Sequence, residues 1–147
     1  MKPGAAWELQ LGLFHAEYRK AGEALVFHCH PGTKHVAGRL VYESKGPPDF
    51  TGILKSGRMV SFDAKEIGKG TRFPFANLKP HQAAHLAQVH DMGGISFLAI
   101  RFREAGLRLI LPWSWLRTMI EAGCASALSH EMLSMDDYGW LNWAKGQ

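Results

Sequence analysis

The sequence has few cysteines and no long apolar run. These two shortages exclude a disulfide-rich protein and a protein with a membrane-spanning helix. Only Cys29 and Cys124 occur among 147 residues, too few for a disulfide framework, so we expect a reducing compartment. No apolar stretch reaches the ~20 residues that a membrane-spanning helix needs. Residues 1–7 lack the charged-then-apolar pattern of a secretory signal. We therefore expect a cytoplasmic protein without a membrane partner.

Internal repeats, low-complexity tracts and linkers are also missing from the sequence. A chain of this length suits a single domain, spanning residues 1–147. Hydrophobic residues make up 46% of the chain and charged residues 20%, which is typical of globular rather than disordered proteins.

Positive charge is present, and it is concentrated in one segment. The net charge is +4 at pH 7 and the pI is near 9.2. Residues 34–79 hold nine of the 17 Lys and Arg residues but only four acidic ones, a net charge of +5, which leaves −1 for the rest. Such a segment is either a solvated basic face or a surface for a polyanion such as DNA.

Apolar residues recur at helical spacing in three segments, which we predict to be helices. The first helix covers residues 5–21 and carries an apolar stripe of Trp7, Leu11, Phe14 and Tyr18. A second helix over residues 80–91 begins at Pro80 and ends before Gly93. A third is expected over residues 112–121.

Short β-prone runs bounded by turn residues predict five strands, over residues 24–29, 50–54, 59–65, 95–102 and 107–111. We expect the first to be buried, and the next two to form a β-hairpin across residues 55–58. Residues 31–48 are interpreted as an irregular basic loop, and residues 125–147 have no clear assignment. This order predicts an α/β fold with a mixed central sheet flanked by helices.

The pattern with the most chemical content is Pro48-Asp49 followed by Asp63-Ala64-Lys65. Asp63 and Lys65 are two apart on a predicted strand, so both side chains leave one face while Ala64 packs into the core. Asp49 lies at the start of the preceding strand, where it can approach Asp63.

Two neighbouring carboxylates of this kind suit a divalent cation. They repel each other, and Mg²⁺, which prefers oxygen ligands, relieves that repulsion. The cation would activate a water and neutralise charge at a phosphate, with Lys65 beside that water. The alternative is that Asp49 caps a turn, and that Asp63 and Lys65 belong to an exposed strand face.

Two further residues are candidates for the same site. Glu8 shares a helical stripe with His15, and Gly12 between them leaves room for close approach, so Glu8 could complete the metal site. Gln82, near the start of its helix, could hydrogen-bond the attacking water or a phosphate. An ordinary solvated position is the alternative for both. No common structural zinc spacing is matched by His28, Cys29, His30 and His35.

In order and spacing, several stretches resemble RecU-type Holliday junction resolvases of the PD-(D/E)xK nuclease superfamily. They are residues 48–52, 61–66, 71–75, 81–85, 88–89 and 93–97. The FDAKE, TRFPF and HQxxH motifs among them are specific in combination, whereas a lone PD…DxK pattern is not. The resemblance runs from about Trp7 to Trp115.

This resemblance implies a restriction-endonuclease-like fold, a homodimer, and dependence on Mg²⁺ or Mn²⁺. It also implies paired symmetric nicking of four-way DNA junctions during recombination and repair. The resemblance assigns metal binding to Glu8, Asp49 and Asp63, and adds Lys65 and Gln82 as catalytic residues.

The resemblance also implies a DNA-binding surface. Residues 34–47 occupy the position of the family's protruding basic stalk, which enters the centre of the junction. We expect DNA phosphates to be contacted by basic residues in and around this segment, namely Lys34, Arg39, Lys45, Lys69, Arg72 and Lys79.

Two departures from the family pattern favour a compact, phage-type member, acting in a bacterial cytoplasm. The long basic N-terminal extension of cellular RecU proteins is missing, and the part after Trp115 matches poorly. One rival is a repair or restriction-type PD-(D/E)xK endonuclease that acts on duplex DNA. The other is a junction-binding protein without catalysis. Comparing cleavage of a four-way junction with cleavage of its component duplex distinguishes these hypotheses.

Overall fold

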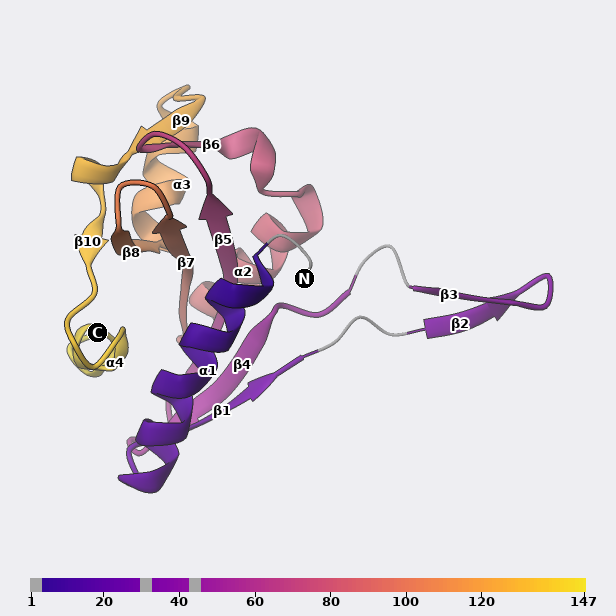
Figure 1. Cartoon of the computed structure of the whole chain (residues 1–147), viewed down its shortest axis with the longest axis horizontal. Helices are drawn as coiled ribbons and strands as arrows, with labels where there is room; N and C mark the ends of the chain where they lie inside the picture. Colours follow the sequence, from indigo (N-terminus) through magenta and orange to yellow (C-terminus); the bar gives the residue numbers. More distant parts are fainter. Residues whose placement is uncertain (1–3, 30–32, 43–45) are drawn as a thin grey trace.

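A mixed six-stranded sheet forms the centre of the computed structural model, which describes residues 4–29, 33–42 and 46–147 (Figure 1). From edge to edge the strands are β1 (Ala24–His28), β4 (Phe50–Leu54), β5 (Met59–Ile67), β7 (Ile95–Phe102), β8 (Leu107–Pro112) and β10 (Leu133–Ser134). Neighbouring strands are antiparallel except for β5 and β7, which are parallel. The predicted α/β class with a mixed central sheet is confirmed.

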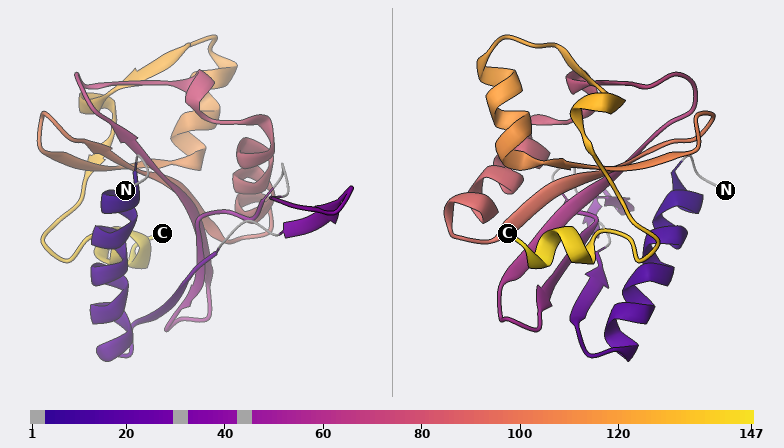
Figure 2. Two further views of the ribbon diagram at one scale, coloured as in Figure 1. Left: turned by 45° about the vertical axis from the view of Figure 1, so that its right-hand side comes forward. Right: turned by 90° about the vertical axis from the view of Figure 1, so that its left-hand side faces the viewer.

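Helices cover both faces of this sheet (Figure 2). They are α1 (Ala5–Lys20), α2 (Pro80–Asp91), α3 (Trp113–Glu121) and α4 (Leu141–Lys145). Residues of α1 and α4 pack in one core, and residues of α2 and α3 pack in the other. Strand β7 supplies Phe97 and Ala99 to the first core and Leu98 and Ile100 to the second, because it is covered on both faces. None of the helices in the described ranges has the length and hydropathy needed to span a membrane.

A short antiparallel pair outside the main sheet joins the middle of the chain to its last quarter. Strand β6 (Arg72–Pro74) pairs with β9 (Ser126–Leu128). A 3₁₀ turn follows each of them, η1 (Phe75–Asn77) and η2 (Ser129–Glu131). This pairing anchors the segment that leads into α2.

Residues 33–42, which we predicted to be irregular, form a β-hairpin. Strand β2 (Thr33–Val36) pairs with β3 (Arg39–Tyr42), and Ala37 and Gly38 between them have φ values of 51° and 77°. Positive φ at both central residues matches the twist of a two-residue hairpin turn. The hairpin projects away from the sheet, as expected of the stalk (Figure 1). Our prediction was wrong because Ala-Gly is a weaker turn signal than Asn-Gly.

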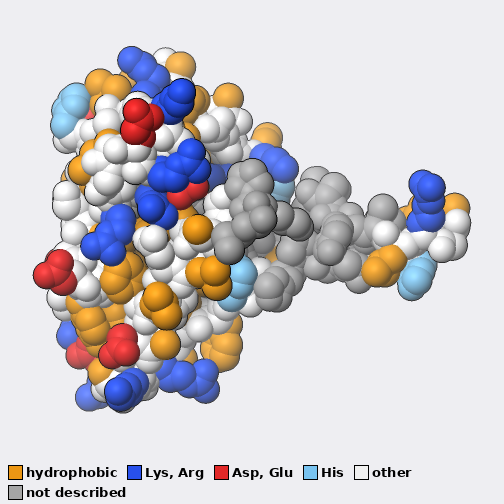
Figure 3. Space-filling model, in the orientation of Figure 1, with side chains coloured by type: hydrophobic (Ala, Val, Ile, Leu, Met, Phe, Trp, Pro, Cys, Tyr) orange, Lys and Arg blue, Asp and Glu red, His pale blue; other side chains and the backbone are white. Residues whose placement is uncertain are grey.

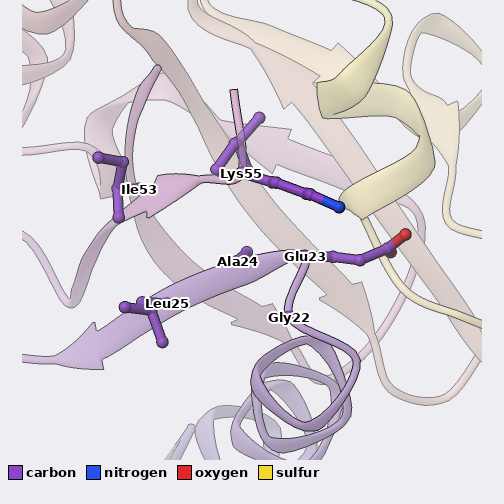
Figure 4. A pocket seen from close by; sticks show the side chains of 7 residues that line it. Gly22, Glu23, Ala24, Leu25, Ile53 and Lys55 are labelled. Atoms are coloured by element: carbon purple, nitrogen blue, oxygen red, sulfur yellow. The ribbon is translucent and has the colours of Figure 1, made fainter. Parts of the chain in front are cut away.

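Strand β1 was predicted to be buried, and this prediction is also wrong. It is the edge strand of the sheet, with Leu25 41% and Phe27 52% exposed. Leu25 lies opposite Ile53 of β4, and the two line a shallow hollow of about 260 Å³ (Figure 4). Apolar composition identifies a strand but does not reveal whether both of its faces are covered.

The C-terminal region, which the sequence left unassigned, belongs to the core. Trp140 is fully buried, and its indole N–H donates to Nε2 of His15 at 3.0 Å. The Tyr18 hydroxyl accepts the backbone N–H groups of Trp140 and Leu141, and donates to the carbonyl of Tyr138. Burial lowers the pKa of His15 to about 3, with a smaller contribution from His28. His15 therefore has a structural role on the buried face of α1.

Candidate active site

Asp49 and Asp63 are brought together at the start of the β4–β5 hairpin. The backbone N–H of Asp49 donates to Oδ1 of Asp63 at 3.0 Å, and the backbone N–H of Ala64 donates to Oδ2 of Asp49 at 2.8 Å. The antiparallel register, in which Phe50 lies opposite Phe62, sets up both contacts. The carboxylate of Asp63 is thus bound to the backbone of Asp49, and the carboxylate of Asp49 is bound to the backbone that follows Asp63. The predicted approach of the two acids is observed.

Asp63 carries a carboxylate oxygen without a hydrogen-bond partner. The residue is only 2% exposed, and its Oδ2 has no such partner among the described residues. The pKa of Asp63 is raised to about 6, mainly by burial and also by the charges of Asp49 and Glu8. The hydrogen bond from the Asp49 backbone and the charge of Lys65 oppose this rise. A buried, unpaired carboxylate oxygen is costly unless a cation or a proton compensates it.

Lys65 extends from the same strand toward α2, where two oxygens hold its amine. Its Nζ donates to the backbone carbonyl of Asn77 and to Oε1 of Gln82, each at 3.0 Å. The same Oε1 accepts the backbone N–H of Lys79, which fixes the Gln82 side chain at the start of the helix. Burial lowers the pKa of Lys65, and the charges of Asp63 and Asp49 partly offset this effect. The sequence did not reveal the role of Asn77, because it acts through its backbone.

Glu8 lies near this group but faces a different partner. The indole N–H of Trp7 donates to the carbonyl of Ala99, which lies opposite Ala64 on the neighbouring strand. The first turn of α1 is thereby anchored beside the acids. Oε1 of Glu8 lies 3.3 Å from Nε2 of His28. Among the described residues, no three His, Cys, Asp or Glu side chains converge closely enough to hold an ion. Metal binding by Glu8 remains a prediction.

The predicted DNA-binding residues occupy two parts of the molecule. Arg39 is exposed on the projecting hairpin, whereas Lys69, Arg72 and Lys79 are exposed on the body. Lys34 lies in β2, and Lys45 falls outside the described residues. Figure 3 shows Lys and Arg side chains, with a few acidic ones among them, on the upper half of the body.

A hollow of about 670 Å³ lies between the base of the hairpin segment and α2. It is lined by Gly46, Lys79, Pro80, His81, Ala84, His85 and Gln88. Lys79, which borders this hollow, also donates its backbone N–H to Gln82. The hollow therefore borders the first turn of α2, whose Gln82 also holds the amine of Lys65.

Comparisons with known proteins agree with one another. The family model described as Recombination protein U matches residues 26–138. A Holliday junction resolvase RecU from Staphylococcus carnosus is 35% identical over 81 residues, which are 55% of this chain and 38% of that protein. The Oenococcus oeni protein of the same name is 33% identical over 96 residues, 63% of this chain and 48% of its own length. The chain thus spans less than half the length of these relatives.

Among solved structures, the Holliday junction resolvase Hjc of Archaeoglobus fulgidus is similar to this chain. It aligns with a TM-score of 0.45 and 16% sequence identity, over 72% of this chain and 75% of that chain. Glu8 precedes the residues that the family model matches, whereas Asp49, Asp63, Lys65 and Gln82 lie within them.

Proposed function

Since this chain belongs to the Recombination protein U family, we propose that it is a Holliday junction resolvase. In this proposal it is a metal-dependent endonuclease that introduces paired, symmetric nicks into four-way DNA junctions during recombination and repair. The observation that carries the proposal is the interlocked pair of Asp49 and Asp63 with the amine of Lys65 held beside it. A protein that only bound junctions would gain nothing from a buried carboxylate with an unpaired oxygen.

The donor set fits Mg²⁺ or Mn²⁺. Asp63 presents its unpaired Oδ2, and Asp49 stands beside it with its own carboxylate. Both are oxygen ligands, and these cations need only one or two carboxylates when waters and phosphate oxygens complete the coordination shell. Asp49 and Asp63 would hold the ion, with Glu8 as a third acid. When bound, the cation supplies a water of lowered pKa and positive charge at the phosphate.

Lys65 and Gln82 would then act on the DNA side of the site. The amine of Lys65 is half-buried and held by two oxygens, so it is preorganised to donate to a phosphate oxygen or to orient the attacking water. Gln82 holds that amine in place through Oε1. In this proposal the amine would face the phosphate as one positive donor, already held in position by Asn77 and Gln82.

The DNA would follow the basic parts of the surface. The projecting hairpin with Arg39 suits the role of a stalk that enters the centre of a junction. The 670 Å³ hollow beside Lys79 offers a path for one phosphate backbone between the hairpin segment and α2. Because most affinity would come from Lys and Arg contacts to phosphates, junction binding should weaken steeply with salt.

Paired cuts require two active sites, so the proposal includes a homodimer about a two-fold axis. Partly exposed apolar side chains form a row on the side of the sheet that faces away from α1. We call this row the open face; it consists of Leu25, Phe27, Ile53 and Met59. Leu25, Ile53 and Met59 are paired across adjacent strands and are 41%, 45% and 44% exposed. The open face is the surface we propose for the second copy.

The test is a cleavage assay on a mobile four-way junction and on its component duplex, each with and without Mg²⁺. The resolvase proposal expects symmetric nicks in the junction, only with metal, and little cleavage of the duplex. Equal cleavage of both substrates would favour a duplex endonuclease. Junction binding without nicking at any Mg²⁺ or Mn²⁺ concentration would favour a non-catalytic binding protein.

A further inference from the structure

The Glu8–His28 contact links two elements that approach the site from different directions. Glu8 is on α1, whereas His28 ends β1, which pairs with the strand that follows Asp49. We propose that His28 is a positioning residue that orients the Glu8 carboxylate at the edge of the site, so that Glu8 can join Asp49 and Asp63 when a divalent cation binds. This inference rests on the proposed nuclease function.

His28 is itself held firmly relative to Asp49. In the β1–β4 register it lies opposite Phe50, and the two rings stack with centroids 4.8 Å apart and an interplanar angle of 23°. Phe50 is fully buried and makes an edge contact with the ring of His15 at 4.8 Å. The next residue, Cys29, donates its backbone N–H to the carbonyl of Asp49 at 2.8 Å. The imidazole is therefore attached to the same pair of strands that carries Asp49.

Glu8 needs such a partner because, among the described residues, no other hydrogen bond orients its carboxylate. Its charge raises the pKa of Asp63, so the two carboxylates are close enough to repel each other. A glutamate side chain with several rotatable bonds can relieve this repulsion by turning away. A carboxylate only accepts hydrogen bonds, so Nε2 of His28 is the donor in the 3.3 Å contact.

The pair also borders an open hollow. Glu8, His28 and Phe50 line a hollow of about 440 Å³ that is completed by four residues of α1, Ala5, Leu9, Gly12 and Leu13. Hydrogen-bond partners of metal-binding carboxylates commonly contribute ~10–100-fold to metal affinity or activity. His28 is thus placed to affect the affinity for the cation without touching the DNA path beside Lys79.

Two substitutions of His28 separate the effect of its hydrogen bond to Glu8 from the effect of its ring stacking on Phe50. His28→Phe keeps an aromatic ring against Phe50 but removes the donor, whereas His28→Gln keeps a donor near the position of Nε2. Mn²⁺ binding is measured without DNA, from the loss of the free-ion electron paramagnetic resonance signal. Junction binding is measured without metal, and junction cleavage is measured over a Mg²⁺ titration. His90→Phe, at an exposed position near the end of α2, is the matched control.

We expect His28→Phe to weaken Mn²⁺ binding ~10–100-fold, with a parallel rise in the Mg²⁺ concentration for half-maximal cleavage, and we expect Glu8→Gln to have a similar effect. His28→Gln should recover Mn²⁺ affinity to within a few-fold of the parent. The Glu8→Gln/His28→Phe double variant should be no weaker than either single variant, because both remove one coupled unit. Junction binding without metal should stay the same in all of them.

Unchanged Mn²⁺ affinity in His28→Phe, with affinity lost in Glu8→Gln, would overturn the inference. Failure of His28→Gln to recover affinity, together with additive losses in the double variant, would indicate a direct ligand and overturn it as well. Failure of the proposed function would give a different result: the unsubstituted protein would cut no junction at any metal concentration.

Discussion

Removing the charge of Asp63 should stabilise the metal-free protein while abolishing its activity. The pKa of Asp63 is raised from 3.8 to about 6, mainly by burial. At ~1.4 kcal/mol for each pKa unit, the ionised carboxylate costs the folded state about 3 kcal/mol at pH 8. Asp63→Asn removes this cost, and its amide oxygen can still accept the backbone N–H of Asp49.

The sign of the pH dependence follows from the order of deprotonation. Between about pH 4 and pH 6 the unfolded chain loses the Asp63 proton before the folded protein does, so the parent loses stability as the pH rises. Above this window both states are ionised and the cost is constant. The advantage of Asp63→Asn over the parent should therefore grow by about 2.5 kcal/mol between pH 4 and pH 8.

Urea unfolding in EDTA at pH values from 4 to 8 measures this difference directly. Asp137→Asn, at an exposed position, should show a difference within ~0.5 kcal/mol at every pH. Adding Mn²⁺ at about 100 times its Kd should stabilise the parent by about 2.7 kcal/mol and leave Asp63→Asn nearly unchanged. Nicking by Asp63→Asn should fall by several orders of magnitude with junction binding retained. An Asp63→Asn advantage that does not vary with pH would refute the reasoning.

Four other predictions concern the amine, the sheet, the first helix and the tail. Lys65→Met should lower junction cleavage by about 10²–10³-fold with unchanged junction binding, and a smaller loss would show that its amine does not face the phosphate. Gly52→Ala should lower the free energy of unfolding by at least about 1–3 kcal/mol, because its Cβ would lie 2.1 Å from a backbone oxygen of Leu25. Gly12→Ala, with open space around it, should instead raise this free energy by about 0.5–1 kcal/mol in the same denaturation assay. Tyr18→Phe should cost about 1–3 kcal/mol for each backbone group left unpaired, and should speed hydrogen exchange in the tail; unchanged exchange would contradict the assigned anchor.

Some features of the site could be read from local sequence because they depend on local geometry. A strand turns alternate side chains to opposite faces, so Phe62 and Ala64 had to leave one face of β5, and Asp63 and Lys65 the other. The hairpin turn then brings the start of β4 beside the middle of β5, which is why the approach of Asp49 to Asp63 was predictable. The main elements flanking this hairpin follow from periodicity in the same way.

Other features depended on which parts of the chain cover one another, and periodicity does not encode this. The apolar run of β1 predicted a strand but not its place at the edge of the sheet, where Phe27 is exposed. His15 looked like a neighbour of Glu8 on a helix stripe, yet it is buried because Trp140, 125 residues further along the chain, packs against it.

The sequence alone determined which residues we propose for the chemistry, since the spacing of the acids and the lysine on a hairpin is a local property. The tertiary structure decided how those residues are held. Lys65 is fixed by Asn77 and Gln82 from a separate segment, and Glu8 faces His28 because an anchored helix crosses the edge of the sheet. Such contacts form only when distant segments pack together, and their energy comes from burial and hydrogen bonds that no single segment contains.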